Sequence, residues 1–259
     1  MKKILAVGDS FTSANFRSIP YPDYDVSYDK WPAIIGKEFN QEVVNLGMCG
    51  TGNDFITTTA LDQILAKPDR YSLVMIGTTD ITRFSVYRYF NLHPIQTNIV
   101  LKRQDSTFSS KIADYQKVSM GLFEYLCDHV IHPRKGPILI HQMYREFILQ
   151  ILRIQNACKI NNIPLIITSL ISPLSYQVIR NVYHTDLPYS KEDMLKQFIN
   201  VKEFYQVDPS NIIGWPFYPE LGGYQITDSF TDDHRIGEYD AHPNKLGHEL
   251  IAQQILKEL

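Results

Sequence analysis

The chain has 259 residues, of which 44% are hydrophobic and 20% are charged, and its net charge at pH 7 is −3. These values fit one large globular domain and exclude a predominantly disordered chain. They give no sign of a nucleic-acid-binding protein, which usually carries a basic patch or stripe. No stretch approaches the ~18 apolar residues of a membrane span, so we expect neither nucleic acid nor a membrane as a partner.

The first element in chain order is a short apolar run, Ile4 to Val7, near the N-terminus. It is shorter than the ~7–15 apolar residues at the centre of a signal peptide, so we interpret it as a buried strand. The three cysteines are Cys49, Cys127 and Cys158, an odd number with no CxxC pair. They indicate reduced thiols and a cytoplasmic protein rather than a disulfide framework.

Strand and helix patterns then alternate along the chain. In order, we expect a strand over Lys3–Val7, a helix over Trp31–Phe39, a strand over Glu42–Leu46, a helix over Phe55–Leu65, a strand over Tyr71–Ile76, an amphipathic segment over about Met143–Lys159, a strand over Ile163–Ser169 and a helix over Lys245–Leu259. This alternation predicts a parallel sheet with helices on both faces.

The predicted fold is therefore a three-layer α/β/α sandwich with a mostly parallel, roughly five-stranded sheet in the flavodoxin-like order 2-1-3-4-5. Residues 81–140 and 174–235 are long, aromatic and irregular in pattern. We interpret both as insertions beside the core of a single domain that spans residues 1–259.

Several strand ends carry polar or glycine-rich residues that could meet in one site. Ligands of open α/β sheets bind outside the carboxyl ends of the strands. Ser10 follows the first strand, and Asp240 and His242 precede the last helix. A serine hydroxyl is a weak nucleophile that needs an imidazole to take its proton and a carboxylate to orient that imidazole. These three residues supply all three groups.

Three blocks of the sequence resemble those of a known family, the SGNH/GDSL hydrolases. Gly8-Asp9-Ser10-Phe11-Thr12 is similar to the family's first block, and Asn45-Leu46-Gly47-Met48-Cys49-Gly50 to its second. Asp240-Ala241-His242-Pro243-Asn244 is similar to the final block. The resemblance implies that Ser10 is the nucleophile, His242 the general base and Asp240 its partner. It also implies that the backbone N–H groups of Ser10 and Gly50 donate to the oxyanion.

Two blocks depart from the family pattern. The family's third block usually reads Gly-x-Asn-Asp and supplies an oxyanion donor, whereas this chain has Gly77-Thr78-Thr79-Asp80. Either Thr79 or Asn53, in the preceding loop, is therefore the candidate for that donor. In the final block Asp240 lies two residues before His242 rather than three. Glu238 and Asp233 remain alternative partners for the imidazole.

Other motifs are weaker. Gly47 to Gly52 reads Gly-x-x-Gly-x-Gly rather than the dinucleotide-binding Gly-x-Gly-x-x-Gly. His129 and His132 have a spacing that could bind a metal, but we interpret both as surface or loop histidines. His248 is expected to pack on the last helix. We therefore expect no metal and no organic cofactor.

The function that the resemblance implies is hydrolysis of an ester through an acyl-enzyme. The substrate would be an O-acetyl or other acyl ester of a carbohydrate or small molecule, and the sequence does not choose among these. Two alternatives stay open: an O-acyltransferase that uses the same serine and histidine, and a non-catalytic binding or structural module that kept the fold. The sequence does not indicate the oligomeric state.

Overall fold

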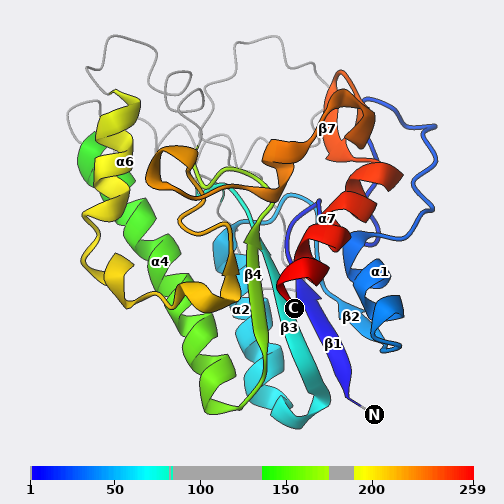
Figure 1. Ribbon diagram of the computed structural model, residues 1–259, viewed down its shortest axis with the longest axis horizontal. Coiled ribbons are helices and arrows are strands. Elements are labelled where there is room, and N and C mark those ends of the chain that lie inside the picture. Colours follow the sequence, from blue (N-terminus) through cyan, green and yellow to red (C-terminus); the bar gives the residue numbers. More distant parts are fainter. Residues whose placement is uncertain (1, 82, 84–135, 175–189) are drawn as a thin grey trace, which may run out of the picture.

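The computed structural model describes residues 2–81, 83, 136–174 and 190–259. Five parallel strands form one sheet in the order β2-β1-β3-β4-β5 (Figure 1). Their bounds are Lys3–Val7 for β1, Val43–Asn45 for β2, Tyr71–Thr78 for β3, Leu165–Ser169 for β4 and Ile212–Ile213 for β5. The predicted parallel sheet and its strand order are confirmed.

Helices lie on both faces of this sheet, and a hairpin precedes the last of them (Figure 1). The α-helices are α1 (Trp31–Glu38), α2 (Asn53–Ala66), α4 (Gly136–Ile160), α6 (Lys191–Ile199) and α7 (Lys245–Glu258). The hairpin pairs β6 (Arg235–Gly237) with β7 (Asp240–Pro243) in antiparallel fashion. Short 3-10 helices cover Pro68–Arg70, Lys202–Gln206, Pro209–Asn211, Pro219–Leu221, Ile226–Ser229 and Asp232–His234.

The alternation of side chains along the strands creates the two apolar layers. On β1, Leu5 and Val7 belong to a core cluster that includes residues of α2, α4 and α6. Ile4 and Ala6 point to the opposite face, into a cluster with residues of α1 and α7. Successive residues of a strand face opposite sides of a sheet, so a strand buried on both faces reads as a continuous apolar run. The predicted α/β/α sandwich is confirmed.

The structure differs from the sequence prediction mainly in the second half of the chain. Helix α4 begins at Gly136, seven residues before Met143. Proline is compatible with the first turn of a helix, so Pro137 does not prevent this earlier start. The prediction missed it because the apolar residues that follow Pro137 are consecutive and show no helical spacing. The segment 174–235 is not purely irregular, since it contains α6 and the edge strand β5. A strand of two residues is too short to show a periodic pattern.

Much of the first predicted insertion lies outside the described residues, as do residues 175–189 of the second. His129, His132 and Cys127 also lie outside them. Among the helices that the structure does describe, none combines the length and the apolar character needed to cross a membrane.

His248 joins α7 to the beginning of α1. The side chain is only 2% exposed, and its Nδ1 accepts a hydrogen bond of 3.3 Å from the backbone N–H of Trp31. Trp31 is the first residue of α1, and the first N–H groups of a helix have no partner within the helix. Burial lowers the pKa of His248 to about 3, and the charges of Lys30 and His242 act in the same direction. The imidazole is therefore a neutral acceptor.

This buried imidazole predicts a loss of stability in mild acid. The pKa falls from 6.5 to about 3 on folding, so the unfolded chain binds the proton first and stability is lost as pH falls below 6.5. The limiting slope is about 1.4 kcal/mol per pH unit. We expect this group to cost about 2 kcal/mol between pH 6.5 and pH 5. Urea unfolding of the wild type and His248→Gln at several pH values checks this, and parallel pH dependences would contradict it.

Candidate active site

Ser10 lies on a tight turn directly after β1. The backbone carbonyl of Asp9 accepts hydrogen bonds of 3.0 Å from the N–H groups of both Thr12 and Ser13. The Asp9 side chain accepts another from the N–H of Phe11, also at 3.0 Å. These bonds wrap the chain around Asp9 and bring the next residue, Ser10, to the carboxyl edge of the sheet. Ser10 is 8% exposed.

The other two candidate residues come from β7, at the opposite end of the chain. Asp240 and His242 are two positions apart on this strand, and residues i and i+2 of a strand share a face. The spacing of two therefore suits this site, because it places both side chains on the side of Ser10. Asn244 follows as the N-cap of α7, where its side chain accepts a hydrogen bond from Gly247. Its amide group also donates to the carbonyls of Asp233 and Arg235, which fixes the hairpin.

A chain of hydrogen bonds connects the three side chains. Nε2 of His242 lies 2.8 Å from Oγ of Ser10, and Nδ1 of His242 lies 2.5 Å from Oδ1 of Asp240. The backbone N–H of His242 also donates to Oδ1 of Asp240, at 3.1 Å. Glu238 and Asp233, the alternative acids, are exposed, and Asp240 is the acid that contacts the imidazole. The geometry has the form of a nucleophile, a base and an orienting carboxylate.

Apolar rings enclose the imidazole of His242. Phe16 stacks on it with ring centroids 4.2 Å apart, and Phe11 packs at 4.9 Å with its plane tilted by 40°. These contacts restrict the rotation of the imidazole, so that its two nitrogens keep facing Ser10 and Asp240.

Asp240 is held in its ionised form. Burial raises its pKa, but hydrogen bonds from Ser18 and from the side chain and backbone of His242 outweigh burial and leave the pKa below its ordinary value. Ser18 donates to Oδ2 of Asp240 at 2.5 Å. An ionised carboxylate is the form that stabilises an imidazolium on His242.

The glycine-rich loop after β2 packs directly on the turn that carries Ser10. A Cβ atom on Gly47 would lie 2.8 Å from the carbonyl carbon of Thr12 and 2.9 Å from the nitrogen of Ser13, so only glycine fits there. Asn45 donates from its side chain to the carbonyl of Thr12, at 2.8 Å. The N–H of Met48 donates to the carbonyl of Gly8, at 3.0 Å. The first two sequence blocks therefore form one unit.

Gly50, the candidate backbone donor in this loop, has a φ of 75°. That left-handed conformation strongly favours glycine, because a Cβ atom is strained there. The conformation explains why glycine stands at this position.

Thr79 hydrogen bonds to both Asn53 and Asp9. The Asn53 side chain donates to the carbonyl of Thr79 at 2.7 Å and accepts from its N–H at 2.9 Å. The hydroxyl of Thr79 donates to Oδ2 of Asp9, at 2.9 Å. Because a threonine hydroxyl carries a single hydrogen, this bond leaves Thr79 none to offer an oxyanion. Asn53 keeps one amide hydrogen in addition to the one that it gives to Thr79.

Solved structures include proteins that are similar to this chain, with low sequence identity. No protein-family model and no curated protein matches the sequence. Among solved structures, the chain is similar to a member of the lipolytic protein G-D-S-L family from Veillonella parvula. The identity is 16% and the TM-score 0.43, over 99% of this chain and 97% of that one.

It is also similar to an acetylxylan esterase from Geobacillus stearothermophilus, with 12% identity and a TM-score of 0.45 over 99% and 93% of the two chains. An α/β hydrolase enzyme from a metagenome of Lake Arreo gives 14% identity and a TM-score of 0.43 over 99% and 94%. One of these structures is named a member of the G-D-S-L family, the family whose sequence blocks this chain resembles. At such low identities and TM-scores they assign neither an activity nor a substrate to this chain.

The structure also brings residues to the site that the sequence analysis did not select. These are Ser18 on Asp240, Phe16 on the imidazole, and Arg83, whose Nη1 lies 3.1 Å from Oδ2 of Asp9. Burial raises the pKa of Asp9, while Arg83, the N–H of Phe11 and Thr79 oppose that rise. No sequence signal marks Ser18 or Phe16, because both lie in a loop without periodic pattern.

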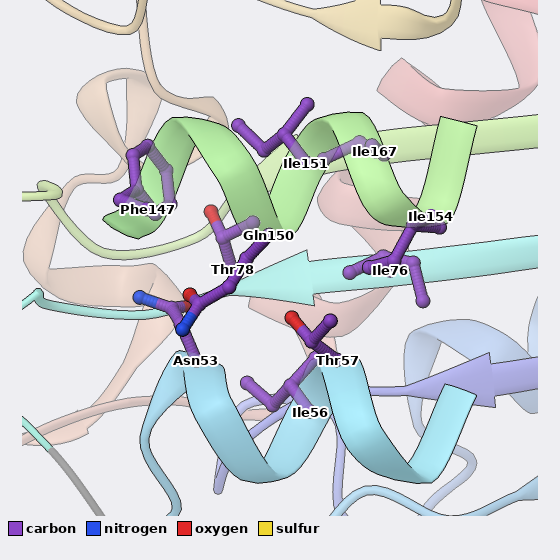
Figure 2. Close-up of a pocket in the computed structure, with 10 residues that line it drawn as sticks. All are labelled: Asn53, Ile56, Thr57, Ile76, Thr78, Phe147, Gln150, Ile151, Ile154 and Ile167. Atoms are coloured by element: carbon purple, nitrogen blue, oxygen red, sulfur yellow. The ribbon is translucent and has the colours of Figure 1, made fainter. Parts of the chain in front are cut away.

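A small pocket lies beneath the carboxyl end of β3, between α2 and α4 (Figure 2). Figure 2 shows Asn53 and Thr78 at one end of it and Ile76 and Ile154 at the other. The complete lining is Asn53, Ile56, Thr57, Ile76, Thr78, Phe147, Gln150, Ile151, Ile154 and Ile167. Ser10 and His242 are not among its lining residues, whereas Asn53 is.

In the part of the chain that the structure describes, no three His, Cys, Asp or Glu side chains gather closely enough to hold a metal ion. Cys49 lies in the loop after β2, and burial raises the pKa of its thiol. A raised pKa disfavours the thiolate that metal binding and nucleophilic attack require.

Proposed function

We propose that this chain is a serine hydrolase that cleaves an ester through an acyl-enzyme on Ser10. The observation that carries the proposal is the continuous path of hydrogen bonds from Ser10 through His242 to Asp240, with distances of 2.8 and 2.5 Å. The resemblance of the three sequence blocks to SGNH/GDSL hydrolases supports the same reaction class.

In the first half-reaction, Oγ of Ser10 attacks the ester carbonyl carbon while Nε2 of His242 takes the hydroxyl proton. Asp240 stabilises the resulting imidazolium through Nδ1. The negative charge on the carbonyl oxygen is stabilised by the N–H groups of Ser10 and Gly50, with the second amide hydrogen of Asn53 as a third candidate. Each such donor contributes about 3–4 kcal/mol to lowering the barrier.

Collapse of this intermediate breaks the bond to the leaving alcohol, which receives the proton from His242. Water then enters, gives a proton to His242 and attacks the acyl carbon. The second collapse releases the carboxylic acid and returns the proton to Ser10. None of these steps requires a metal or an organic cofactor.

We propose an O-acetyl or other short acyl ester of a carbohydrate or small molecule as the substrate. p-Nitrophenyl acetate is the simplest first assay, because its leaving group needs little recognition. Acetylated xylo-oligosaccharides are a practical carbohydrate assay, since one of the similar solved structures is named an acetylxylan esterase.

The proposal predicts that the wild type hydrolyses p-nitrophenyl acetate and that Ser10→Ala lowers kcat by roughly 10⁴-fold or more. Ser229→Ala is a matched control, because Ser229 hydrogen bonds to Ile226 and Gln254 and not to the candidate triad. Equal rates for the wild type and Ser10→Ala would contradict the proposal. If an added sugar acceptor takes the acyl group in place of water, the activity is that of the acyltransferase alternative.

A further inference from the structure

Ser18 lies in the loop between β1 and α1 and contacts the side of Asp240 that faces away from the imidazole. Its hydroxyl is 2.5 Å from Oδ2 of Asp240, while Oδ1 receives Nδ1 and the backbone N–H of His242. Ser18 is 5% exposed and Asp240 is 4% exposed, so water cannot readily replace either partner. The carboxylate is thus held at both oxygens by separate parts of the chain.

The direction of the Ser18 hydrogen bond is fixed by a third group. Oγ of Ser18 accepts a hydrogen bond of 3.0 Å from the backbone N–H of Tyr21. That contact occupies a lone pair and leaves the single hydroxyl hydrogen for Asp240, whose ionised carboxylate can only accept. A hydrogen bond to an ionised group in a buried site is stronger than one between neutral groups.

The same loop also holds the imidazole. Phe16, two residues before Ser18, stacks on His242 at 4.2 Å between ring centroids. The loop is in turn joined to the hairpin, because the hydroxyl of Tyr21 accepts from the N–H of Tyr239 at 3.4 Å. One short stretch of chain therefore touches the carboxylate, the imidazole and the turn between β6 and β7.

We propose that Ser18 is a positioning residue, which holds the Asp240 carboxylate rotated so that Oδ1 faces His242. This inference rests on the proposed function and deepens it, because it adds a fourth side chain to the site. Ser18 acts through Asp240 and does not touch the reacting atoms.

Other ionisable groups surround the pair, but none of those described replaces Ser18. Asp9 and His248 interact with His242 through their charges, and Tyr28 interacts in that way with Asp240. The hydroxyl of Tyr28 hydrogen bonds to the carbonyl of Pro243. Within the described residues, the side-chain donors to Asp240 are His242 and Ser18.

Removing the Ser18 hydroxyl is expected to shift the pH dependence of the reaction in one direction. Without that donor, the negative charge on Oδ2 of Asp240 loses a stabilising hydrogen bond. The carboxylate therefore becomes more basic. A more basic carboxylate attracts the imidazolium form of His242 more strongly. The acid limb of the rate profile therefore moves upward in pH.

The experiment compares the wild type, Ser18→Ala and Ser18→Thr, with Ser229→Ala as the control. Hydrolysis of p-nitrophenyl acetate gives kcat and KM, and inactivation by a fluorophosphonate ester gives a second rate, both across pH 5 to 9. For Ser18→Ala we expect kcat to fall roughly 10- to 100-fold, with KM almost unchanged. We also expect the acid limb to move to higher pH. Ser18→Thr, which keeps the hydroxyl, restores both rate and profile.

The outcomes separate this inference from the proposed function. If the wild type neither hydrolyses the ester nor reacts with the fluorophosphonate, the proposed function fails, and this inference fails with it. If the wild type reacts and Ser18→Ala retains its rate and acid limb, only the positioning role is wrong. A lower kcat with an unmoved acid limb that Ser18→Thr does not restore would indicate a merely structural role and would also overturn the inference. Ser18→Cys, with a weak thiol donor, gives an intermediate shift and covers the case in which Ser18→Ala does not fold.

Discussion

Replacing His242 by alanine is expected to lower kcat for ester hydrolysis by about 10⁴- to 10⁶-fold. Nε2 of His242 lies 2.8 Å from Oγ of Ser10, and among the described residues it is the side chain placed to accept the hydroxyl proton. Ser10 would then have to attack as a neutral alcohol. Steady-state kinetics with p-nitrophenyl acetate measures the effect. The fold is checked by circular dichroism, because the variant leaves a space beside Phe16.

His234→Ala is the matched control for this substitution. His234 lies on a short 3-10 helix before β6, where its side chain contacts Thr231. We expect this variant to keep kcat within about two-fold of the wild type, since a surface substitution of this kind changes little. If His242→Ala is as active as His234→Ala, His242 is not the base.

Asp240→Asn is expected to lower kcat by about 10³- to 10⁴-fold with little change in shape. The carboxylate accepts the Nδ1 hydrogen of His242, which leaves Nε2 free to accept the proton of Ser10. An asparagine that turns its amide hydrogens toward Nδ1 favours the other tautomer, in which Nε2 carries the hydrogen. That tautomer cannot take a proton from Ser10. The kcat of the purified variant, with its unfolding midpoint in urea, measures both parts of this prediction.

The neighbouring acids provide sharp controls for Asp240. Glu238→Gln and Asp233→Asn remove the same charge from exposed positions in the same segment. Both variants should retain the kcat of the wild type. A large loss in either, combined with an active Asp240→Asn, would show that another acid orients the imidazole.

Much of the fold follows from local patterns in the sequence. The run Lys3–Val7 predicts β1 because its residues face apolar layers on both sides of the sheet. Helix α1 begins where Pro32 and the apolar spacing predict it. The edge strand β5 has only two residues, and α6 begins with a capping box of Ser190 and Asp193 rather than a strong apolar run. The sequence did not predict either element, because the segment that contains them shows no sustained helical or strand periodicity.

The candidate site could be predicted from sequence only where its residues lie in recognisable blocks. Ser10 follows β1 of the five-stranded sheet and His242 lies on β7 of the separate hairpin, so the two ends of the chain meet at the site. The contact between Ser18 and Asp240 spans 222 positions and depends on the path of an irregular loop. No local pattern encodes such a contact.

The sequence position of Thr79 in the third block does not by itself identify the oxyanion donor. Thr79 stands where the family usually has an asparagine, and the sequence leaves its hydroxyl and the Asn53 amide as alternative donors. In the structure the hydroxyl of Thr79 faces the buried carboxylate of Asp9, and the Asn53 amide spans the backbone of Thr79. These bonds favour Asn53 over Thr79, and they depend on side-chain directions that the sequence does not specify.

The central claim is that Ser10 is a nucleophile activated by His242. Its most direct test is to treat the folded protein with a fluorophosphonate and to locate the adduct by peptide mass spectrometry. We expect one adduct per chain, on Ser10, and no adduct in Ser10→Ala or, over the same time, in His242→Ala. A folded wild-type protein that forms no adduct, or forms it on another residue, would contradict this account.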